Sequence, residues 1–218
     1  MVSVLLLAGG ALAVYPHVED WEGGTLAGWT GNTTSSVVVY VANGGNPDGH
    51  IQTRRGGVDD FDIGAMTDIP DFTGNYIAAG ITGASVDLIF ITGAFDDVWL
   101  RFRYQDATQN GWRYPLTDVF PDTWQTYSVL FNPAWSDLDA RAAGWITDDD
   151  VDPGADPSAS FAATMANVYT VEVRIAGDGS MIAGIDNFAV IPEPTSILLL
   201  GTGLVALRKK RLIRIRHR

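Results

Sequence analysis

The sequence predicts an all-β fold: an antiparallel jelly-roll β-sandwich with short connecting helices and a separate segment at each end. β-Prone runs of four to nine residues recur along residues 14–191, between clusters of Gly, Asn, Asp and Pro. These strands do not alternate with long helical patterns, which argues against a parallel βαβ sheet. The length of 218 residues suits one sandwich with end segments.

Eight runs carry the strand signal, and eight strands suit a jelly roll. In chain order they are Ser36–Val41, His50–Thr53, Asn75–Ala79, Ser85–Ile91, Asp97–Tyr104, Thr123–Phe131, Val168–Ala176 and Gly184–Val190. Two short helices are predicted as connections, over Asp137–Ala143 and Ser158–Asn167, with Ser158 or Ser160 as the N-cap of the second.

Two of these strands alternate clearly between apolar and polar residues. Within residues 97–104 the apolar set is Val98, Leu100, Phe102 and Tyr104, and the other set is Trp99, Arg101 and Arg103. Within residues 168–176 the inward set is Val171, Val173 and Ile175, which leaves Glu172 and Arg174 facing outward. Because successive side chains of a strand point to opposite faces, we expect Arg101, Arg103, Glu172 and Arg174 to share one non-core face. That face is either a surface ladder of ion pairs or a ligand groove.

The charge is divided unevenly along the chain. Residues 192–218 carry a net charge of +6, so the total of −12 leaves −18 for residues 1–191, which contain no lysine. An acidic body argues against nucleic acid as a partner, because phosphate binding requires a basic surface. The absence of cysteine excludes disulfides, thiolate zinc sites and a cysteine nucleophile.

Residues 1–13 are predicted to be a signal peptide. They contain an apolar run and end on Ala11-Leu12-Ala13, a small-x-small pattern that signal peptidase accepts. The segment is short and lacks a cationic start, so we expect the initiator to lie upstream of Met1. The alternative is a buried N-terminal strand.

Residues 192–218 combine three features in order: Pro192-Glu193-Pro194, an apolar stretch over Thr195–Leu207, and the basic cluster 208–211. This segment resembles the PEP-CTERM sorting signal of bacterial exported proteins, with a C-terminal hydrophobic helix. The resemblance implies an exosortase-type membrane protease as partner, transient anchoring in the inner membrane, and delivery to the cell surface or extracellular matrix. An ordinary tail anchor is the alternative.

Residues 148–156 form an acidic run that suggests a calcium loop at first sight. Counted from Asp148, however, glycine falls at the seventh place instead of the sixth, and the twelfth place is Ala159 instead of Glu. We therefore expect a solvated acidic loop.

The two ends of the body carry a second calcium candidate. The opening Asp20–Trp29 and the closing Gly184–Val190 resemble the first and last strands of carbohydrate-binding-module-like and laminin B-like jelly rolls. In such folds an early acid and a late aspartate often hold a structural Ca²⁺. The resemblance implies Glu22 and Asp186 as ligands, with Asp48 completing the oxygen shell. The alternative is that these residues only form turns.

No catalytic motif is recognisable. The sequence has no nucleophile elbow, no HExxH, no Walker loop and no glycosidase motif around its few glutamates, so we predict no enzyme activity.

Binding is favoured instead by the aromatic content, which includes seven tryptophans and seven tyrosines. Sugars dock on exposed aromatic planes with polar groups beside them. We expect a polysaccharide or other matrix component as ligand, bound by Trp99, Arg101, Arg103, Trp112 and Tyr114. The alternatives are a structural or cell-surface interaction protein without sugar binding and, third, a polysaccharide hydrolase.

Overall fold

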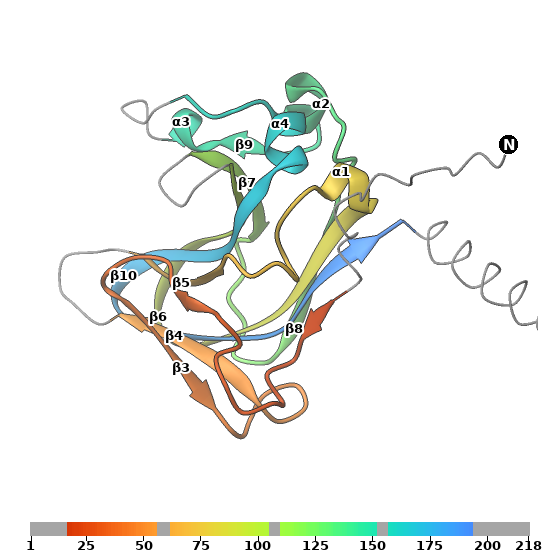
Figure 1. Ribbon diagram of the computed structural model, residues 1–218. Helices are drawn as coiled ribbons and strands as arrows, with labels where there is room; N and C mark the ends of the chain where they lie inside the picture. Colours follow the sequence, from red (N-terminus) through yellow and green to blue (C-terminus); the bar gives the residue numbers. More distant parts are fainter. Residues whose placement is uncertain (1–16, 56–61, 105–109, 152–156, 194–218) are drawn as a thin grey trace, which may run out of the picture.

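The computed structural model describes residues 17–55, 62–104, 110–151 and 157–193, and they form an antiparallel β-sandwich (Figure 1). The strands are β1 (Val18–Glu19), β2 (Thr30–Gly31), β3 (Ser36–Val41), β4 (His50–Arg55), β5 (Asp62–Thr67), β6 (Ile81–Tyr104), β7 (Gly111–Thr117), β8 (Gln125–Leu130), β9 (Ile146–Thr147) and β10 (Val168–Pro192). The short helices are α1 (Tyr76–Ala79), α2 (Asp137–Ala142), α3 (Asp148–Val151) and α4 (Phe161–Ala166). The predicted all-β sandwich with short connecting helices is confirmed.

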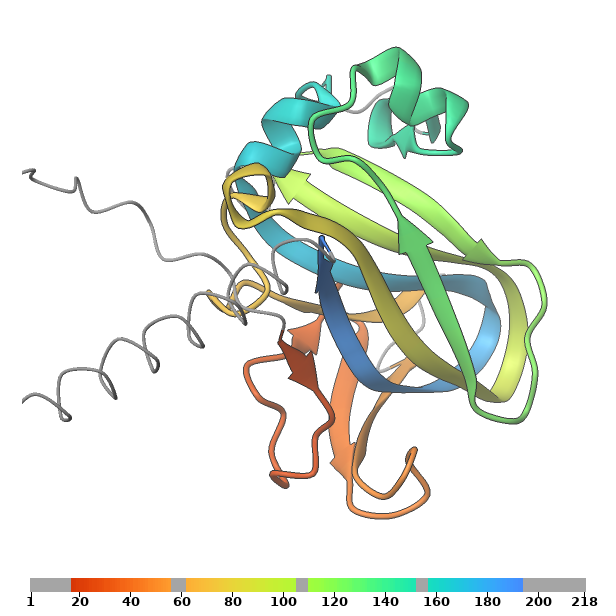
Figure 2. The ribbon, with the colours of Figure 1, turned by 90° about the vertical axis from the view of Figure 1, so that its right-hand side faces the viewer.

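Two long strands, β6 and β10, build both layers of the sandwich. They pair with each other from Val168↔Tyr104 to Pro192↔Ile81, and both bend sharply in the middle (Figure 2). Residues 97–104 and 168–176 form sheet I with β2, β5, β7 and β9. Residues 81–91 and 182–192 form sheet II with β1, β3, β4 and β8.

The sequence predicts four separate strands where the structure has these two continuous ones. The bends fall in exposed stretches that contain Gly93, with φ 129°, and Gly179, with φ 68°. Glycine adopts such φ values with little conformational strain because it has no side chain. Both strands therefore pass from one sheet to the other next to a glycine. Strands β5 and β7 and the two-residue strands β1, β2 and β9 were not predicted.

The core lies between the two sheets and is dense in aromatic rings. All but one of the predicted inward residues are buried: Val98, Leu100 and Phe102 of β6 and Val171, Val173 and Ile175 of β10 are each at most 2% exposed, whereas Tyr104 is half-buried. Trp29, next to β2, meets Phe188 of sheet II with ring centroids 5.0 Å apart. The sheets are therefore held together by side chains that alternation identifies as apolar.

The short helices follow their capping residues. Ser136 and Ser160 cap α2 and α4, and their side chains accept hydrogen bonds from the N–H groups of Asp139 and Ala163. Both predicted helices are confirmed. The predicted strand Asn75–Ala79 is wrong: Asn75 caps α1 by accepting from the N–H of Ala78 at 2.8 Å, and Gly80 ends the helix with φ 66°.

The described chain ends just beyond the sandwich. Pro192 is the last residue of β10, and the N–H of Glu193 donates to the carbonyl of Gly80 at 2.7 Å. Pro194, the signal segment 1–13 and the apolar stretch 195–207 lie outside the described residues. Among the helices that the structure describes, none is long and apolar enough to cross a membrane.

Candidate functional site

The outer face of sheet I carries the charged residues that alternation singled out. Arg101 lies opposite Glu172 of β10 on one side and Arg113 of β7 on the other, and Trp99 lies opposite Arg174. The register confirms the predicted shared face. We call this surface the arginine face and define it by Trp99, Arg101, Arg103, Arg113, Glu172 and Arg174.

Two carboxylates connect the arginines of this face. Glu172 Oε2 accepts from Arg101 Nη1 at 3.0 Å and from Arg103 Nη2 at 2.9 Å. Asp148, the first residue of α3, accepts through Oδ2 from Arg101 Nε and through Oδ1 from Arg113 Nε, each at 2.9 Å. The backbone N–H of Gly111 also donates to Asp148 Oδ2, at 2.7 Å. Asp148 thereby ties α3 to β6 and β7.

These charges are buried, which corrects two expectations. Arg101, Arg113, Asp148 and Glu172 are 7%, 3%, 2% and 1% exposed, so the network is no surface ladder. Asp148 is also not part of a solvated loop; residues 152–156 of the acidic run lie outside the described residues. Burial alone would raise the pKa of Glu172, but the charges of Arg101 and Arg103 hold that pKa below its usual value. At Asp148 burial also acts to raise the pKa, but Arg101, Arg113 and the N–H of Gly111 together hold it below its usual value.

Trp99 is the half-buried aromatic residue of the arginine face. The guanidinium carbons of Arg113 and Arg174 lie 5.4 Å and 5.9 Å from its ring centroid, within range of a cation–π contact. Arg174 is in turn paired with Asp62 of β5. Alternation groups Trp99 with Arg101 and Arg103 of its own strand; in the folded sheet the guanidinium groups against its ring come from the adjacent strands instead. The ring is therefore contacted by residues of both neighbouring strands, β7 and β10.

Trp112 and Tyr114 do not belong to this face, which corrects the predicted ligand set. They pair with Phe102 and Leu100, so they point to the core side of β7. Trp112 is 1% exposed and its Nε1 donates to the carbonyl of Ala159 at 2.8 Å. Tyr114 packs against Trp145, with centroids 5.3 Å apart. Alternation within residues 111–117 would have separated both from Arg113, had that strand been recognised.

Sequence reasoning also missed Asn32, Arg113 and Asp148 as members of the network. Asn32 Nδ2 donates to Glu172 Oε1 at 2.9 Å, and its Oδ1 has no hydrogen-bond partner among the described residues. One feature of the sequence could have indicated buried ion pairs. The body has arginine but no lysine, and a planar guanidinium that is always charged suits buried pairing with carboxylates better than an ammonium does.

The predicted calcium ligands meet at the turn that precedes β4. Glu22 Oε1 accepts from the N–H groups of Asp48 and Gly49, at 3.1 Å and 3.0 Å. Asp186 Oδ2 accepts from the N–H of Asn46 at 2.6 Å, and Oδ1 accepts from the N–H of Asn187 at 2.8 Å. The fold thus brings both ends of the body to this one turn.

Asp87 joins these residues from β6, and we call Glu22, Asp87 and Asp186 the acid cluster. Asp186 is 0% exposed, and burial, with added repulsion from Asp87 and Glu22, raises its pKa to about 6. Backbone N–H groups donate to both carboxylate oxygens of Asp186, and the side-chain amides of Asn46 and Asn187 donate to Asp87 Oδ2. Within the described ranges, no group of three or more Asp, Glu or His side chains is arranged to hold a metal ion. Calcium binding by Glu22, Asp48 and Asp186 stays a prediction.

No protein-family model matches the chain, and no curated protein sequence does. Solved structures are similar in fold. A family 11 carbohydrate-binding module of the cellulase Lic26A-Cel5E of Clostridium thermocellum has a TM-score of 0.54 at 16% identity, covering 83% of this chain and 96% of that one. A family 22 module of Xyn10B from the same organism has a TM-score of 0.50 at 14% identity, covering 85% and 99%. An exo-β-agarase has a TM-score of 0.54 at 11% identity, but the match covers only 25% of that chain. The described domain therefore has the jelly-roll fold of carbohydrate-binding modules.

Proposed function

We propose that this domain is a non-catalytic module that binds polysaccharide through the arginine face of sheet I. The observation that carries the proposal is Trp99, a half-buried indole held on the outer face of the sheet between two guanidinium groups. Support comes from the fold, because one similar structure is a family 11 module in complex with a β-1,3-1,4-mixed-linked tetrasaccharide, with a TM-score of 0.52 at 16% identity.

The chemistry of the face suits a sugar. A pyranose ring has an apolar face that packs on an indole, while its hydroxyl groups need hydrogen-bond partners at the rim. Arg174, with 28% of its side chain exposed, lies beside Trp99 and can donate N–H groups to such hydroxyls. The buried pairs beneath hold the platform rigid, which lowers the ordering cost of binding.

A structural role without sugar binding is the second candidate. It is favoured by the ion pairs themselves, since Arg101, Arg103, Arg113 and Arg174 each have a carboxylate partner. In that case the network only fixes α3 and β5 to the sheet, and the protein acts as a cell-surface interaction protein.

Affinity electrophoresis separates the two functions. Native gels are cast with mixed-linked β-glucan or with the exopolysaccharide of the host, and three proteins are run: the unaltered chain, Trp99→Ala and Trp124→Ala. Trp124 is a matched control, a half-buried tryptophan directly before β8 of sheet II, whose ring contacts that of His50. We expect retardation of the unaltered chain and of Trp124→Ala, and its loss in Trp99→Ala. Equal mobility of all three with and without polysaccharide would favour the structural role.

We further propose that the domain is exported and sorted by its C-terminal segment. The support is the order of Pro192-Glu193-Pro194, an apolar stretch and a basic cluster. An exosortase-type protease is the proposed partner, with transient anchoring in the inner membrane before release to the cell surface or matrix. Mass spectrometry of the surface-released protein tests this. We expect no peptide beyond about residue 194, whereas recovery of peptides from residues 212–218 would exclude processing there.

A further inference from the structure

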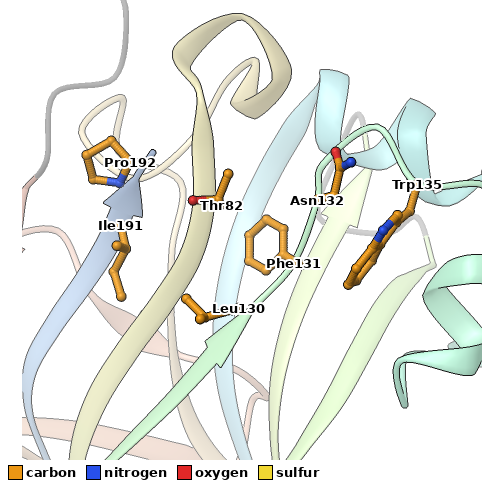
Figure 3. A pocket seen from close by; sticks show the side chains of 7 residues that line it. All are labelled: Thr82, Leu130, Phe131, Asn132, Trp135, Ile191 and Pro192. Carbon is orange, nitrogen blue, oxygen red and sulfur yellow. The ribbon is translucent and has the colours of Figure 1, made fainter. Parts of the chain in front are cut away.

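An apolar groove lies at the end of sheet II (Figure 3). It has a volume of about 510 Å³, and its walls come from the start of β6, the end of β8 with the loop that follows, and the end of β10. Its lining residues are Thr82, Leu130, Phe131, Asn132, Trp135, Ile191 and Pro192. Five of these seven are apolar or aromatic, so a sugar, which needs several polar partners, fits the groove poorly.

One wall of the groove exposes large apolar side chains to water. Leu130 is 72% exposed, and Ile77 of the neighbouring helix α1 is 40% exposed. Trp135 is half-buried and stands across the groove from Ile191 (Figure 3). A leucine this open beside a tryptophan marks a contact surface, because a large apolar side chain gains free energy when it leaves water.

The chain leaves the sandwich at this same place. Ile191 and Pro192 line the groove, and the hydrogen bond from the Glu193 N–H to the Gly80 carbonyl fixes the exit point. The apolar stretch begins at Thr195, three residues after Pro192. Three residues span at most about 11 Å even when fully extended. A membrane that holds the stretch therefore lies within about that distance of the groove.

The short length of the apolar stretch 195–207 favours close contact between the sandwich and the membrane. Residues 195–207 number thirteen, and a helix of thirteen residues is about 20 Å long, against a hydrocarbon core of about 30 Å. A short apolar segment is accommodated by thinning the bilayer and by drawing flanking residues into the interface. The flanking residues on the sandwich side are those of the groove.

We propose that the groove of Leu130, Trp135 and Ile191 is a lipid-contact surface that docks the sandwich onto the membrane. The proposal rests on the membrane anchoring proposed above. The partner is an electrically neutral phospholipid surface, because a body with a net charge of −18 is repelled by anionic headgroups. Trp135 would lie at headgroup level, where tryptophan is enriched in membrane proteins, and Leu130 would reach the acyl boundary.

Single-cysteine labelling of the full chain tests the contact, since the chain has no cysteine of its own. A polarity-sensitive fluorophore is attached in separate variants at Leu130→Cys, Val119→Cys and Leu199→Cys, and each protein is reconstituted with phosphatidylcholine vesicles. Val119 is the matched control: it is 65% exposed, but it lies in the connection to β8 at the opposite end of that strand. Leu199 reports insertion of the apolar stretch.

On addition of vesicles, we expect the fluorophore emission at positions 130 and 199 to shift to shorter wavelength and to increase several-fold in intensity. At position 119 we expect no change in either quantity. A shift at 199 without one at 130 would overturn the groove proposal and leave anchoring intact. Equal shifts at 130 and 119 would overturn it as well, because contact would then not be specific to the groove. No shift at 199 would overturn the anchoring and, with it, the contact. None of these outcomes depends on glycan binding, which the gel experiment tests separately.

Discussion

Two regions of this sandwich bury carboxylates, and they balance the buried charge with different partners. Asp148 and Glu172 of the arginine face accept hydrogen bonds from guanidinium groups, whereas Asp186 of the acid cluster accepts from backbone N–H groups and lies near two other acids. The arginines lower the pKa of Asp148 and Glu172, while burial raises the pKa of Asp186 to about 6. The partner, and not burial itself, decides whether a buried carboxylate is favourable at neutral pH.

The two regions therefore respond to pH in opposite directions. Because the pKa of Asp148 and Glu172 is lowered in the folded state, their stabilisation is present above the unfolded pKa of about 4 and is lost as the pH falls through the folded values. The folded pKa of Asp186 is raised, so the folded state binds its proton more tightly than the unfolded state. Its contribution to stability is lost as the pH rises from about 4 to about 6.

The largest effect is expected from removing the charge of Asp148. Asp148→Asn leaves Arg101 and Arg113 buried without their shared anion, which should lower the free energy of unfolding by about 3–5 kcal/mol. Asp150, on the same helix, is the matched control, because its pair with Arg141 is exposed. Asp150→Asn should cost about 1 kcal/mol or less. Urea denaturation at pH 7 measures both, and equal losses would contradict the special role of the buried network.

A smaller and pH-dependent effect is expected at Asp186. Its titration should lower the free energy of unfolding by about 2 kcal/mol between pH 4 and pH 7, and Asp186→Asn should remove that contribution. The measurement is the difference between the urea stability curves of the unaltered chain and the variant across this range. Parallel curves would show that the acid cluster does not titrate as described.

Calcium binding would make the two regions more alike, because a cation would give the acid cluster the counter-charge that the arginine face already has. If Glu22 and Asp186 bind Ca²⁺, a free concentration ten times the dissociation constant stabilises the fold by about 1.4 kcal/mol. The melting temperature should then rise by a few degrees. Calorimetry with calcium and with chelator measures the shift, which Glu22→Gln should abolish and Asp178→Asn, at an exposed bend, should retain. Identical curves with calcium and chelator would remove the site.

The sequence predicted the sheet face on which a side chain lies better than it predicted where one strand ends and the next begins. Alternation placed Arg101 and Glu172 on one side and Phe102 and Val173 on the other, and both placements hold in the sheets. The bends of β6 and β10 were not predictable from alternation, because the exposed residues at the bends interrupt it. Strand β5, with the sequence Asp-Ile-Gly-Ala-Met-Thr, has few β-branched residues and gave no strand signal.

The candidate site was predictable only in part, for a related reason. Arg101 and Arg103 belong to a strand with clear alternation, but their partner Asp148 lies far away in a run of three aspartates that is typical of a solvated loop. Its burial depends on Arg101 and Arg113, which the fold brings to it from two strands. Local patterns do not record such long-range pairing.

Binding at the arginine face is tested by an NMR titration of the tryptophan indole N–H signals with soluble fragments of the host exopolysaccharide. The chain has seven tryptophans, and four of them serve as internal controls because they are at most 1% exposed: Trp21, Trp29, Trp112 and Trp145. We predict that the Trp99 signal shifts with saturating fragment while these four stay in place. A titration in which no indole signal moves, or in which Trp124 or Trp135 moves and Trp99 does not, would contradict binding at the arginine face.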